Sequence, residues 1–297
     1  MKESLLHGQV AIVTGAGAGL GRHYARLLAE LGAAVVVNDV SAHASDVVRE
    51  IERHGGRSTV SNHDVSDPVQ AGEMVQTALD AFGGLHIVVS NAGVIDRTAF
   101  IDMDSAVFDR VMKVNAYGAF NVLRACWPVL VEQKYGRVVA VSSSSAFLPA
   151  AGIAHYAASK GAVLGLAKSL AMEGAEHGIT VNVLAPSALT TMTAAGPSAH
   201  DEEALKRAEA MMSPRLVAPV VAWLVRPENA LNGEVIEAAA GRAAMNFVGS
   251  TRGFWSPDLT VAELVEHSDT VFDLRDFAVL KDITELNAWL TTRTTGW

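Results

Sequence analysis

The feature that most constrains the fold is an alternation of short apolar stretches with segments of helical periodicity over about the first 240 residues. The apolar stretches are strand-length and predict strands at Gln9–Thr14, Ala34–Asn38, Arg57–His63, His86–Ser90, Gly136–Ser142, Ile179–Leu184 and Glu234–Ala238. The intervening segments predict helices at Leu20–Leu31, Ser45–His54, Val69–Phe82, Phe108–Gln133, Tyr156–His177 and Pro214–Val225. This alternation is typical of an α/β fold, in which helices cover both faces of a parallel sheet, here of about seven strands.

The order of these elements also predicts the domain organisation. Because crossovers between parallel strands are right-handed, residues 1–240 are expected to form a doubly wound, Rossmann-like domain. The segment 187–212 precedes a helix start at Ser213-Pro214 and is expected to cross the carboxyl edge of the sheet as a substrate loop. Residues 241–297 are interpreted as a C-terminal extension that packs on the same domain or on a neighbouring subunit.

Composition excludes several classes of protein. The 297 residues carry a formal net charge of −9, so a basic footprint for nucleic acid is missing. The single cysteine, Cys126, excludes an intramolecular disulfide framework, and the scattered histidines lack metal-ligand spacing, so no metal site is expected. The apolar runs are too short for a membrane span, and the N-terminal residues do not resemble a cleavable leader. We therefore expect a cytoplasmic protein with no membrane partner.

A glycine-rich segment, Thr14–Gly21, joins the first expected strand to the first expected helix. Glycines let the backbone turn sharply and approach a pyrophosphate, and the helix N-terminus then offers N–H groups and a partial positive charge. Asp39 ends the second strand, where an acid binds the ribose hydroxyls of adenosine and repels a 2′-phosphate. No Arg or Lys stands beside Asp39 or inside the glycine segment, so the sequence favours NAD over NADP.

A second group of residues carries the chemistry of an acid/base site. Tyr156 and Lys160 lie four residues apart on an expected helix and share one face, where the lysine favours the phenolate and lets the tyrosine exchange a proton near neutral pH. Ser143 and Asn91 lie at the carboxyl ends of strands, which form the ligand edge of a parallel sheet. Asn115 lies in the long expected helix, where asparagine is a poor helix former.

Taken together, these residues resemble the short-chain dehydrogenase/reductase family. The matching motifs follow the family order over about 240 residues: Thr14-Gly15-x-x-x-Gly19-x-Gly21, Asp64-Val65, Asn91-Ala92-Gly93, Asn115, Ser143 and Tyr156-x-x-x-Lys160. The resemblance implies a catalytic tetrad of Asn115, Ser143, Tyr156 and Lys160. In that tetrad Tyr156 exchanges the alcohol proton and Ser143 hydrogen-bonds the substrate oxygen. Lys160 holds the nicotinamide ribose and lowers the tyrosine pKa, and Asn115 holds a relay water.

The same resemblance implies the NAD contacts. They are Gly15, Gly17, Gly19, Leu20, Gly21, Asp39, Asp64, Val65, Asn91, Ala92, Gly93, Tyr156, Lys160, Pro186, Leu189 and Thr191. Among them, Asp64 and Val65 would contact adenine, and Leu189 and Thr191 would meet the carboxamide and a phosphate, with the threonine register open by one residue. The chain departs from the family where Pro-Gly is usual, because Pro186 is followed by Ser187.

A narrower resemblance points to the 3-hydroxyacyl-CoA dehydrogenase unit of peroxisomal multifunctional enzyme type 2. It rests on Val13–Arg22, Val35–Asp39, Ala185-Pro186 with Met192-Thr193, and Val217–Leu224. The resemblance implies a secondary alcohol or ketone substrate, with a CoA thioester as one open alternative and a free cyclic, terpenoid or steroid-like alcohol as the other. A different class also stays open, a non-catalytic protein that senses NAD or a lipid. Pairing of the two long helices in many relatives implies a homodimer or homotetramer.

Overall fold

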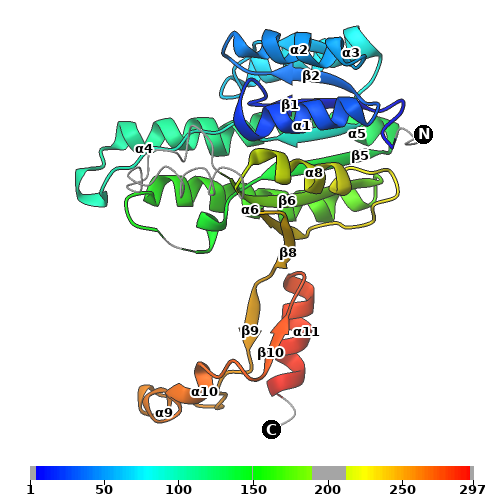
Figure 1. Ribbon diagram of the computed structural model, residues 1–297. Helices are drawn as coiled ribbons and strands as arrows, with labels where there is room; N and C mark the ends of the chain where they lie inside the picture. Colours follow the sequence, from blue (N-terminus) through cyan, green and yellow to red (C-terminus); the bar gives the residue numbers. More distant parts are fainter. Residues whose placement is uncertain (1–4, 149, 189–211, 295–297) are drawn as a thin grey trace. The chain divides into compact units, whose positions relative to one another are not determined.

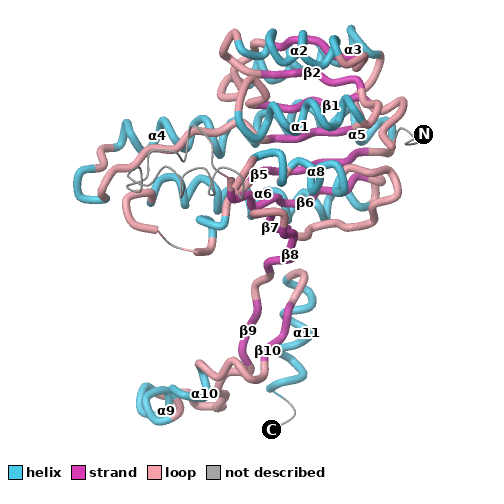
Figure 2. The backbone as a smooth tube through the Cα atoms, viewed as in Figure 1, coloured by secondary structure: helices cyan, strands magenta, loops and turns pink. Residues whose placement is uncertain are grey.

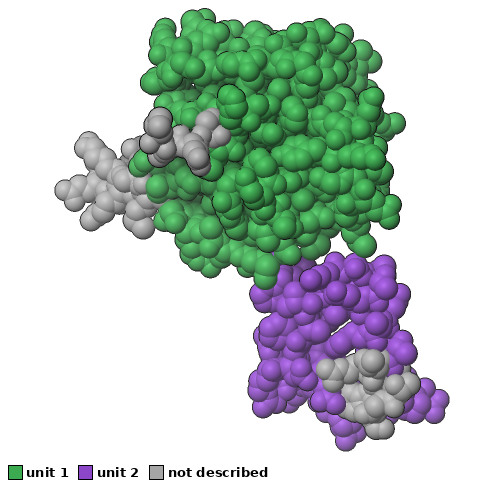
Figure 3. All heavy atoms as spheres, turned by 90° about the vertical axis from the view of Figure 1, so that its right-hand side faces the viewer, with its two compact units in different colours: residues 1–245 green, residues 246–297 purple. Residues whose placement is uncertain are grey.

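The structure is a computed structural model that describes residues 5–148, 150–188 and 212–294. The chain separates into two compact units, Met1–Met245 and Asn246–Trp297, which Figure 3 colours separately. Leu189 and Thr191, with most of the expected substrate loop, lie outside the described residues.

The first unit is built on a sheet of eight strands in the order β3-β2-β1-β4-β5-β6-β7-β8 (Figure 1). The first three strands along the chain are β1 (Val10–Thr14), β2 (Ala34–Asn38) and β3 (Arg57–Ser61), and the next four are β4 (Ile87–Ser90), β5 (Gly136–Val141), β6 (Ile179–Ser187) and β7 (Val235–Ala239). All pairs from β3 to β7 are parallel. The sheet order reverses between β1 and β4, so the two halves of a doubly wound fold meet there.

Helices cover both faces of this sheet (Figure 2). One layer holds α1 (Gly19–Glu30), α2 (His43–Arg53) and α8 (Ala218–Leu224), and the other holds α3 (Pro68–Phe82), α5 (Gly118–Gln133) and α6 (Ala154–Ala175). Successive residues of a strand point to opposite faces of the sheet. In β2, Val35 and Val37 pack in the core under the first helical layer, and Val36 packs in the core under the second. The predicted α/β fold with a largely parallel, two-faced sheet is therefore confirmed.

The structure corrects the strand count. The sequence predicts about seven strands, but an eighth, β8 (Arg242–Asn246), lies beside β7 at the sheet edge. The reversal needs only Ala240 and Gly241, which have positive φ angles of 51° and 77°. Two successive residues with positive φ are what a tight two-residue hairpin requires. The sequence placed Gly241 at the start of the tail because Ala240 carries no turn signal.

Several predicted element boundaries also change. The helix predicted over Phe108–Gln133 is divided into α4 (Ser105–Met112), a π-helical turn η2 (Lys113–Tyr117) and α5, while Pro128 stays inside α5. The helix predicted over Pro214–Val225 begins as a 3-10 turn, Pro214–Leu216, because Pro219 suits only the first turn of α8. The strand predicted to reach His63 ends at Ser61, where pairing with β2 ends.

The second unit has a two-stranded antiparallel sheet of β9 (Gly249–Thr251) and β10 (Phe277–Val279). Its helices are α9 (Val261–Glu266), α10 (Ser268–Val271) and α11 (Ile283–Thr294), and a Thr260–Glu263 capping box starts α9. Among residues 246–291 no side chain is buried, so this unit has no core of its own in that range. Across the described part of the chain, no helix is long and apolar enough to cross a membrane.

Candidate active site

The turn from β1 into α1 forms a cradle of backbone. Gly15 and Gly19 have positive φ angles of 63° and 51°, and a Cβ on Gly21 would lie 2.2 Å from the Gly15 carbonyl oxygen. Leu20 packs against the core and holds the start of α1 in place. That helix has no side-chain cap and no acidic residue in its first turn, so its N–H groups can meet an anion. The arrangement fits the pyrophosphate of a dinucleotide.

Asp39 lies directly against this turn. Its carboxylate accepts hydrogen bonds from the backbone N–H groups of Gly17 at 3.0 Å and Ser41 at 2.9 Å. A Cβ on Gly17 would come within 2.9 Å of the Asp39 carboxyl carbon, so a larger residue there would displace the acid. The chain therefore sets a carboxylate beside the glycines, as an adenosine-ribose site requires.

Asn91 ties the end of β4 to the end of β1. Its side chain donates to the carbonyl oxygens of Thr14 at 2.8 Å and Gly15 at 3.3 Å, while Thr14 Oγ1 accepts from the N–H groups of Asn91 and Ala92. These bonds bridge the point where the sheet order reverses. Thr14 was read only as part of the glycine motif, yet its buried hydroxyl organises this junction.

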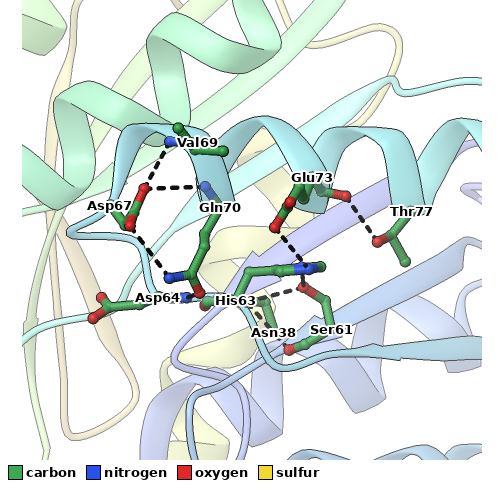
Figure 4. Close-up of polar contacts among 9 residues, drawn as sticks. All are labelled: Asn38, Ser61, His63, Asp64, Asp67, Val69, Gln70, Glu73 and Thr77. Carbon is green, nitrogen blue, oxygen red and sulfur yellow. Dashed lines mark hydrogen bonds and ion pairs between the residues drawn. The ribbon is translucent and has the colours of Figure 1, made fainter.

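At the carboxyl ends of β2 and β3, a cluster of polar side chains holds the backbone that leads to Asp64 (Figure 4). Asn38 Nδ2 donates to Ser61 Oγ at 3.1 Å and to the His63 carbonyl at 2.9 Å. Gln70 Oε1 accepts from the Asp64 N–H at 2.9 Å, and the Asp64 carboxylate points away from the cluster. That carboxylate accepts from the Ser66 N–H at 2.8 Å, so the side chain predicted to contact adenine is held by its own loop.

Val65, the next residue, is buried and linked to α5. Its carbonyl accepts from Asn121 Nδ2 at 3.0 Å, and a Cβ on Gly118 would lie 2.8 Å from its side chain. The loop after β3 therefore rests on the helix that follows the π-helical turn.

Asn115 lies in that turn and joins three segments. Its Oδ1 accepts from the Val94 N–H at 2.7 Å, and its Nδ2 donates to the Val94 carbonyl at 2.9 Å and to Ser159 Oγ at 3.0 Å. A Cβ on Gly93 would lie 3.2 Å from Asn115 Oδ1 and 3.4 Å from Lys160 Nζ. Gly93, Asn115 and Lys160 thus meet at one point of the carboxyl edge.

Ser143 and Tyr156 come together at the same edge. Ser143 follows β5 and accepts from the Ser145 N–H at 3.1 Å, and Tyr156 lies in the first turn of α6. Burial raises the pKa of Tyr156 above its ordinary value, while a side-chain hydrogen bond with Ser143 lowers it. The pair can therefore hold one oxygen atom between two hydroxyls.

Lys160 is buried one turn further along α6. Its Nζ donates to the Val141 carbonyl at 2.8 Å and lies 5.8 Å from the centroid of the Tyr156 ring. Burial lowers the pKa of Lys160 to about 8. Its own carbonyl accepts from Ser142 Oγ at 2.8 Å, so β5 and α6 are joined at both ends of the lysine. An effect of Lys160 on the Tyr156 pKa stays a prediction.

Sequence reasoning missed two supporting hydroxyls, those of Ser142 and Ser159, and gave the Thr14 hydroxyl no role of its own. Ser142 and Ser159 each stand directly next to a motif residue, which is the one signal that could have found them. Pro186, expected in a loop after a strand ending at Leu184, lies instead inside β6, because that strand continues to pair with β7 as far as Ser187.

Neither the single cysteine nor a group of metal-ligating side chains adds a further candidate site in the described part of the chain. Cys126 is buried, and burial raises the pKa of its thiol to about 12, which keeps it protonated and inert. Among the described residues, no group of three His, Cys, Asp or Glu side chains could hold a metal ion.

A glycine turn beside the Asp39 carboxylate and a Ser–Tyr–Lys–Asn edge on a doubly wound sheet form the arrangement that the sequence resemblance predicts for a nucleotide-dependent oxidoreductase. The model of the short chain dehydrogenase family matches residues 9–202. The chain belongs to that family, which indicates a nicotinamide cofactor, either NAD(H) or NADP(H), and a small-molecule substrate.

Two relatives sharpen the comparison. The short-chain type dehydrogenase/reductase Rv0148 of Mycobacterium tuberculosis is 43% identical over 244 residues, covering 79% of this chain and 83% of that protein. Peroxisomal multifunctional enzyme type 2 of Mus musculus is 41% identical over 245 residues, covering 79% of this chain but 32% of the enzyme. The resemblance to the multifunctional enzymes is confirmed, and the chain spans about a third of the length of that relative.

Two solved structures agree in fold. Full-length peroxisomal multifunctional enzyme type 2 of Drosophila melanogaster matches with a TM-score of 0.82 and 31% identity, covering 96% of this chain and 49% of that one. A 7α-hydroxysteroid dehydrogenase in complex with NADH and 7-oxo glycochenodeoxycholic acid matches with a TM-score of 0.74 and 28% identity, covering 83% and 98%.

Proposed function

We propose that this chain is an NAD-dependent oxidoreductase that interconverts a secondary alcohol and a ketone. The observation that carries the proposal is the half-buried Tyr156 at the carboxyl edge, with the Lys160 ammonium one helical turn away and 5.8 Å from the centroid of its ring. A phenol placed in this way can exchange a proton with an alcohol whose oxygen lies between its hydroxyl and that of Ser143.

Each side chain has a separate task. Tyr156 takes the alcohol proton during oxidation and returns it during reduction, and Ser143 holds the substrate oxygen and stabilises its partial charge. Lys160, whose ammonium lies at the same edge, favours the tyrosinate and binds the nicotinamide ribose. Asn115 holds Val94 and Ser159 and so keeps the edge in register. When bound, the nicotinamide cofactor accepts or donates the hydride at the carbinol carbon.

The preference for NAD rests on Asp39. Its carboxylate contacts Gly17, and a 2′-phosphate at the adenosine ribose would meet a like charge there. Titration of the protein with NADH and with NADPH measures this preference directly, and tighter binding of NADPH than of NADH would overturn it.

The substrate we propose first is a 3-hydroxyacyl-CoA. Its support is the 41% identity to peroxisomal multifunctional enzyme type 2, together with the sequence resemblance to the 3-hydroxyacyl-CoA dehydrogenase unit. The second candidate is a free cyclic, terpenoid or steroid-like alcohol, favoured by the likeness to a dehydrogenase solved with a steroid ligand. A non-catalytic sensor of NAD or a lipid is the alternative of another class.

One experiment separates the three. Purified protein is given NAD and a panel of 3-hydroxyacyl-CoAs beside free cyclic, terpenoid and steroid alcohols, and NADH formation is followed. Turnover on the thioesters alone supports the first substrate class, and turnover on the free alcohols alone supports the second. Tight NADH binding with no turnover on any compound would favour the sensor.

We also propose that the chain works as a homodimer or homotetramer. Support comes from the second unit, where large apolar side chains such as Val248, Phe272 and Leu274 are exposed and no described side chain is buried. A cytoplasmic location stays a prediction, and cell fractionation decides it against the peroxisomal location that the names of several relatives suggest.

A further inference from the structure

A cavity of about 480 Å³ opens beside the glycine turn, between the start of α1 and α2. It is lined by Gly17, Arg22, His43, Asp46, Val47, Arg49, Glu50, Arg53 and His54. The lining carries three arginines, so it has the donors that a phosphate would need. Gly17 is also the residue whose N–H binds Asp39, so this cavity adjoins the place where the adenosine ribose is proposed to lie.

Two of the three arginines of this cavity, Arg22 and Arg49, are engaged by carboxylates. Glu50 Oε2 accepts from Arg22 Nε at 3.0 Å and lies 2.9 Å from Arg22 Nη2, while its Oε1 lies 3.0 Å from Arg26 Nη1. Arg49 pairs in the same way with Asp46 on its own helix. Glu50 is thus a single carboxylate that holds two guanidinium groups of α1, one of which faces the cavity.

This pairing matters because Arg22 is the cation nearest to the glycine turn in sequence. A guanidinium turned toward the ribose could donate two hydrogen bonds to a 2′-phosphate and offset the repulsion from Asp39. Glu50 holds the Nε–Nη2 edge of the Arg22 guanidinium, so turning that edge toward the ribose would cost the ion pair. Selection against a 2′-phosphate would then depend on two carboxylates. Asp39 would repel the phosphate, and Glu50 would hold Arg22 away from it.

We propose that Glu50 is a specificity-determining residue, which keeps Arg22 from the 2′-position of the adenosine ribose and so disfavours cofactors that carry a 2′-phosphate. The inference rests on the proposed cofactor site and deepens it. It assigns the cavity between α1 and α2 as the space that a phosphate monoester would enter once Arg22 is released.

The test is a binding titration of the full chain with probes of the adenosine end alone. Adenosine 2′,5′-bisphosphate and 5′-AMP are titrated by calorimetry into the wild-type protein and Glu50→Gln, and NADPH and NADH are titrated by fluorescence. We expect Glu50→Gln to improve the affinity ratio of the bisphosphate to 5′-AMP by about tenfold, since one charge-assisted donor is gained. The affinity for 5′-AMP should change less than about twofold, since 5′-AMP carries no 2′-phosphate for the released Arg22 to bind.

Two further variants distinguish a role of Glu50 in selectivity from a merely structural role, with the affinity ratio of the bisphosphate to 5′-AMP as the readout. Asp46→Asn removes an equal charge from the same cavity but leaves the Arg22–Glu50 pair intact, so its ratio should stay near the wild-type value. The double variant Arg22→Gln/Glu50→Gln should lose the gain, because the released donor is gone. Equal gains in Asp46→Asn and Glu50→Gln, or a gain that survives the loss of Arg22, would overturn the inference.

Failure of this inference is distinguishable from failure of the proposed function. If the wild-type protein binds NADH but Glu50→Gln leaves the bisphosphate ratio unchanged, Glu50 has no role in selectivity and the cofactor site stands. If the wild-type protein binds neither NADH nor 5′-AMP, the proposed site itself is wrong. Thermal unfolding of each variant confirms that the compared proteins are folded.

Discussion

Asn115 holds the candidate site together at the scale of a single residue, because its amide bonds to Val94 and to Ser159 from the π-helical turn. Its side-chain type and its order among the motifs could be read from the sequence, as could the shared face of Tyr156 and Lys160. The three hydrogen bonds that join it to Val94 and Ser159 could not, because they depend on segments brought together only by the fold. The same holds for the Lys160 ammonium, whose partner is a backbone carbonyl that carries no sequence signal.

The buried lysine gives a pH-dependent prediction. Burial lowers the folded-state pKa of Lys160 from 10.5 to about 8, so the unfolded chain binds more protons between these values and the stability contribution of Lys160 rises with pH across that window. We compare Lys160→Met with the wild-type protein by urea unfolding at pH 7.5 and pH 10.5. The free energy of unfolding of the variant relative to wild type should fall by roughly 3 kcal/mol over this range. A difference that stays constant with pH would contradict a buried ammonium.

At the scale of elements, the glycine turn was predictable because β1, the turn and α1 are contiguous in sequence. The π-helical turn around Asn115 was not, since η2 has ordinary helical composition and its irregularity is set by packing between the β4 loop and α6. The edge hairpin into β8 was missed for a similar reason, because Ala240 adopts a positive φ without a glycine signal.

The glycine turn can be tested with a matched pair of substitutions. Gly21→Ala places a Cβ 2.2 Å from the Gly15 carbonyl oxygen, whereas a Cβ on Gly72 in α3 meets nothing within 4 Å. Gly21→Ala should weaken NADH binding at least about tenfold, because the turn must open to admit the methyl group. Gly72→Ala should leave binding unchanged and stabilise the helix by roughly 0.5–1 kcal/mol. Equal NADH affinity in the two variants would show that Gly21 is not part of the cradle.

The π-helical turn gives a second element-scale prediction. Asn115→Ala removes the hydrogen-bond partners of both the N–H and the carbonyl of Val94. Because these two backbone groups lie in a partly buried segment, their loss of hydrogen bonds should lower the free energy of unfolding by roughly 2–3 kcal/mol. Ser159→Ala removes only one of these contacts of Asn115 and should cost about 1 kcal/mol or less. Chemical denaturation ranks the two, and the reverse order would show that Asn115 does not hold this junction.

At the scale of the whole molecule, the sheet and its helical layers followed from hydrophobic periodicity alone. The second unit did not, because no residue of 246–291 is buried, and the periodic segment at Val261–Val271 therefore has no core face that would fix its fold. Its exposed apolar residues are the basis of the proposed assembly. The partner surface for these exposed residues cannot be predicted from hydrophobic periodicity, because it would belong to another copy of the chain.

The proposed assembly is measured by light scattering over a dilution series. We expect a mass of two or four times the 31.3 kDa of the chain. Phe272→Asp, at a side chain that is 76% exposed, should shift the distribution toward lower mass, and Lys281→Glu serves as a polar control in the same unit. A monomer at all concentrations would refute the assembly.

The central claim is that Tyr156 exchanges the proton in an NAD-dependent oxidation of a secondary alcohol. The most direct measurement is NADH formation by Tyr156→Phe on the best substrate of the panel, beside NADH binding by the same variant. The matched control is Tyr24→Phe, because the buried Tyr24 hydroxyl has no hydrogen-bond partner. We expect Tyr156→Phe to keep NADH binding within a few-fold of wild type, because only one of the expected cofactor contacts is lost, and to lose turnover by at least about 10²-fold, while Tyr24→Phe keeps its turnover. Full turnover by Tyr156→Phe would contradict the account.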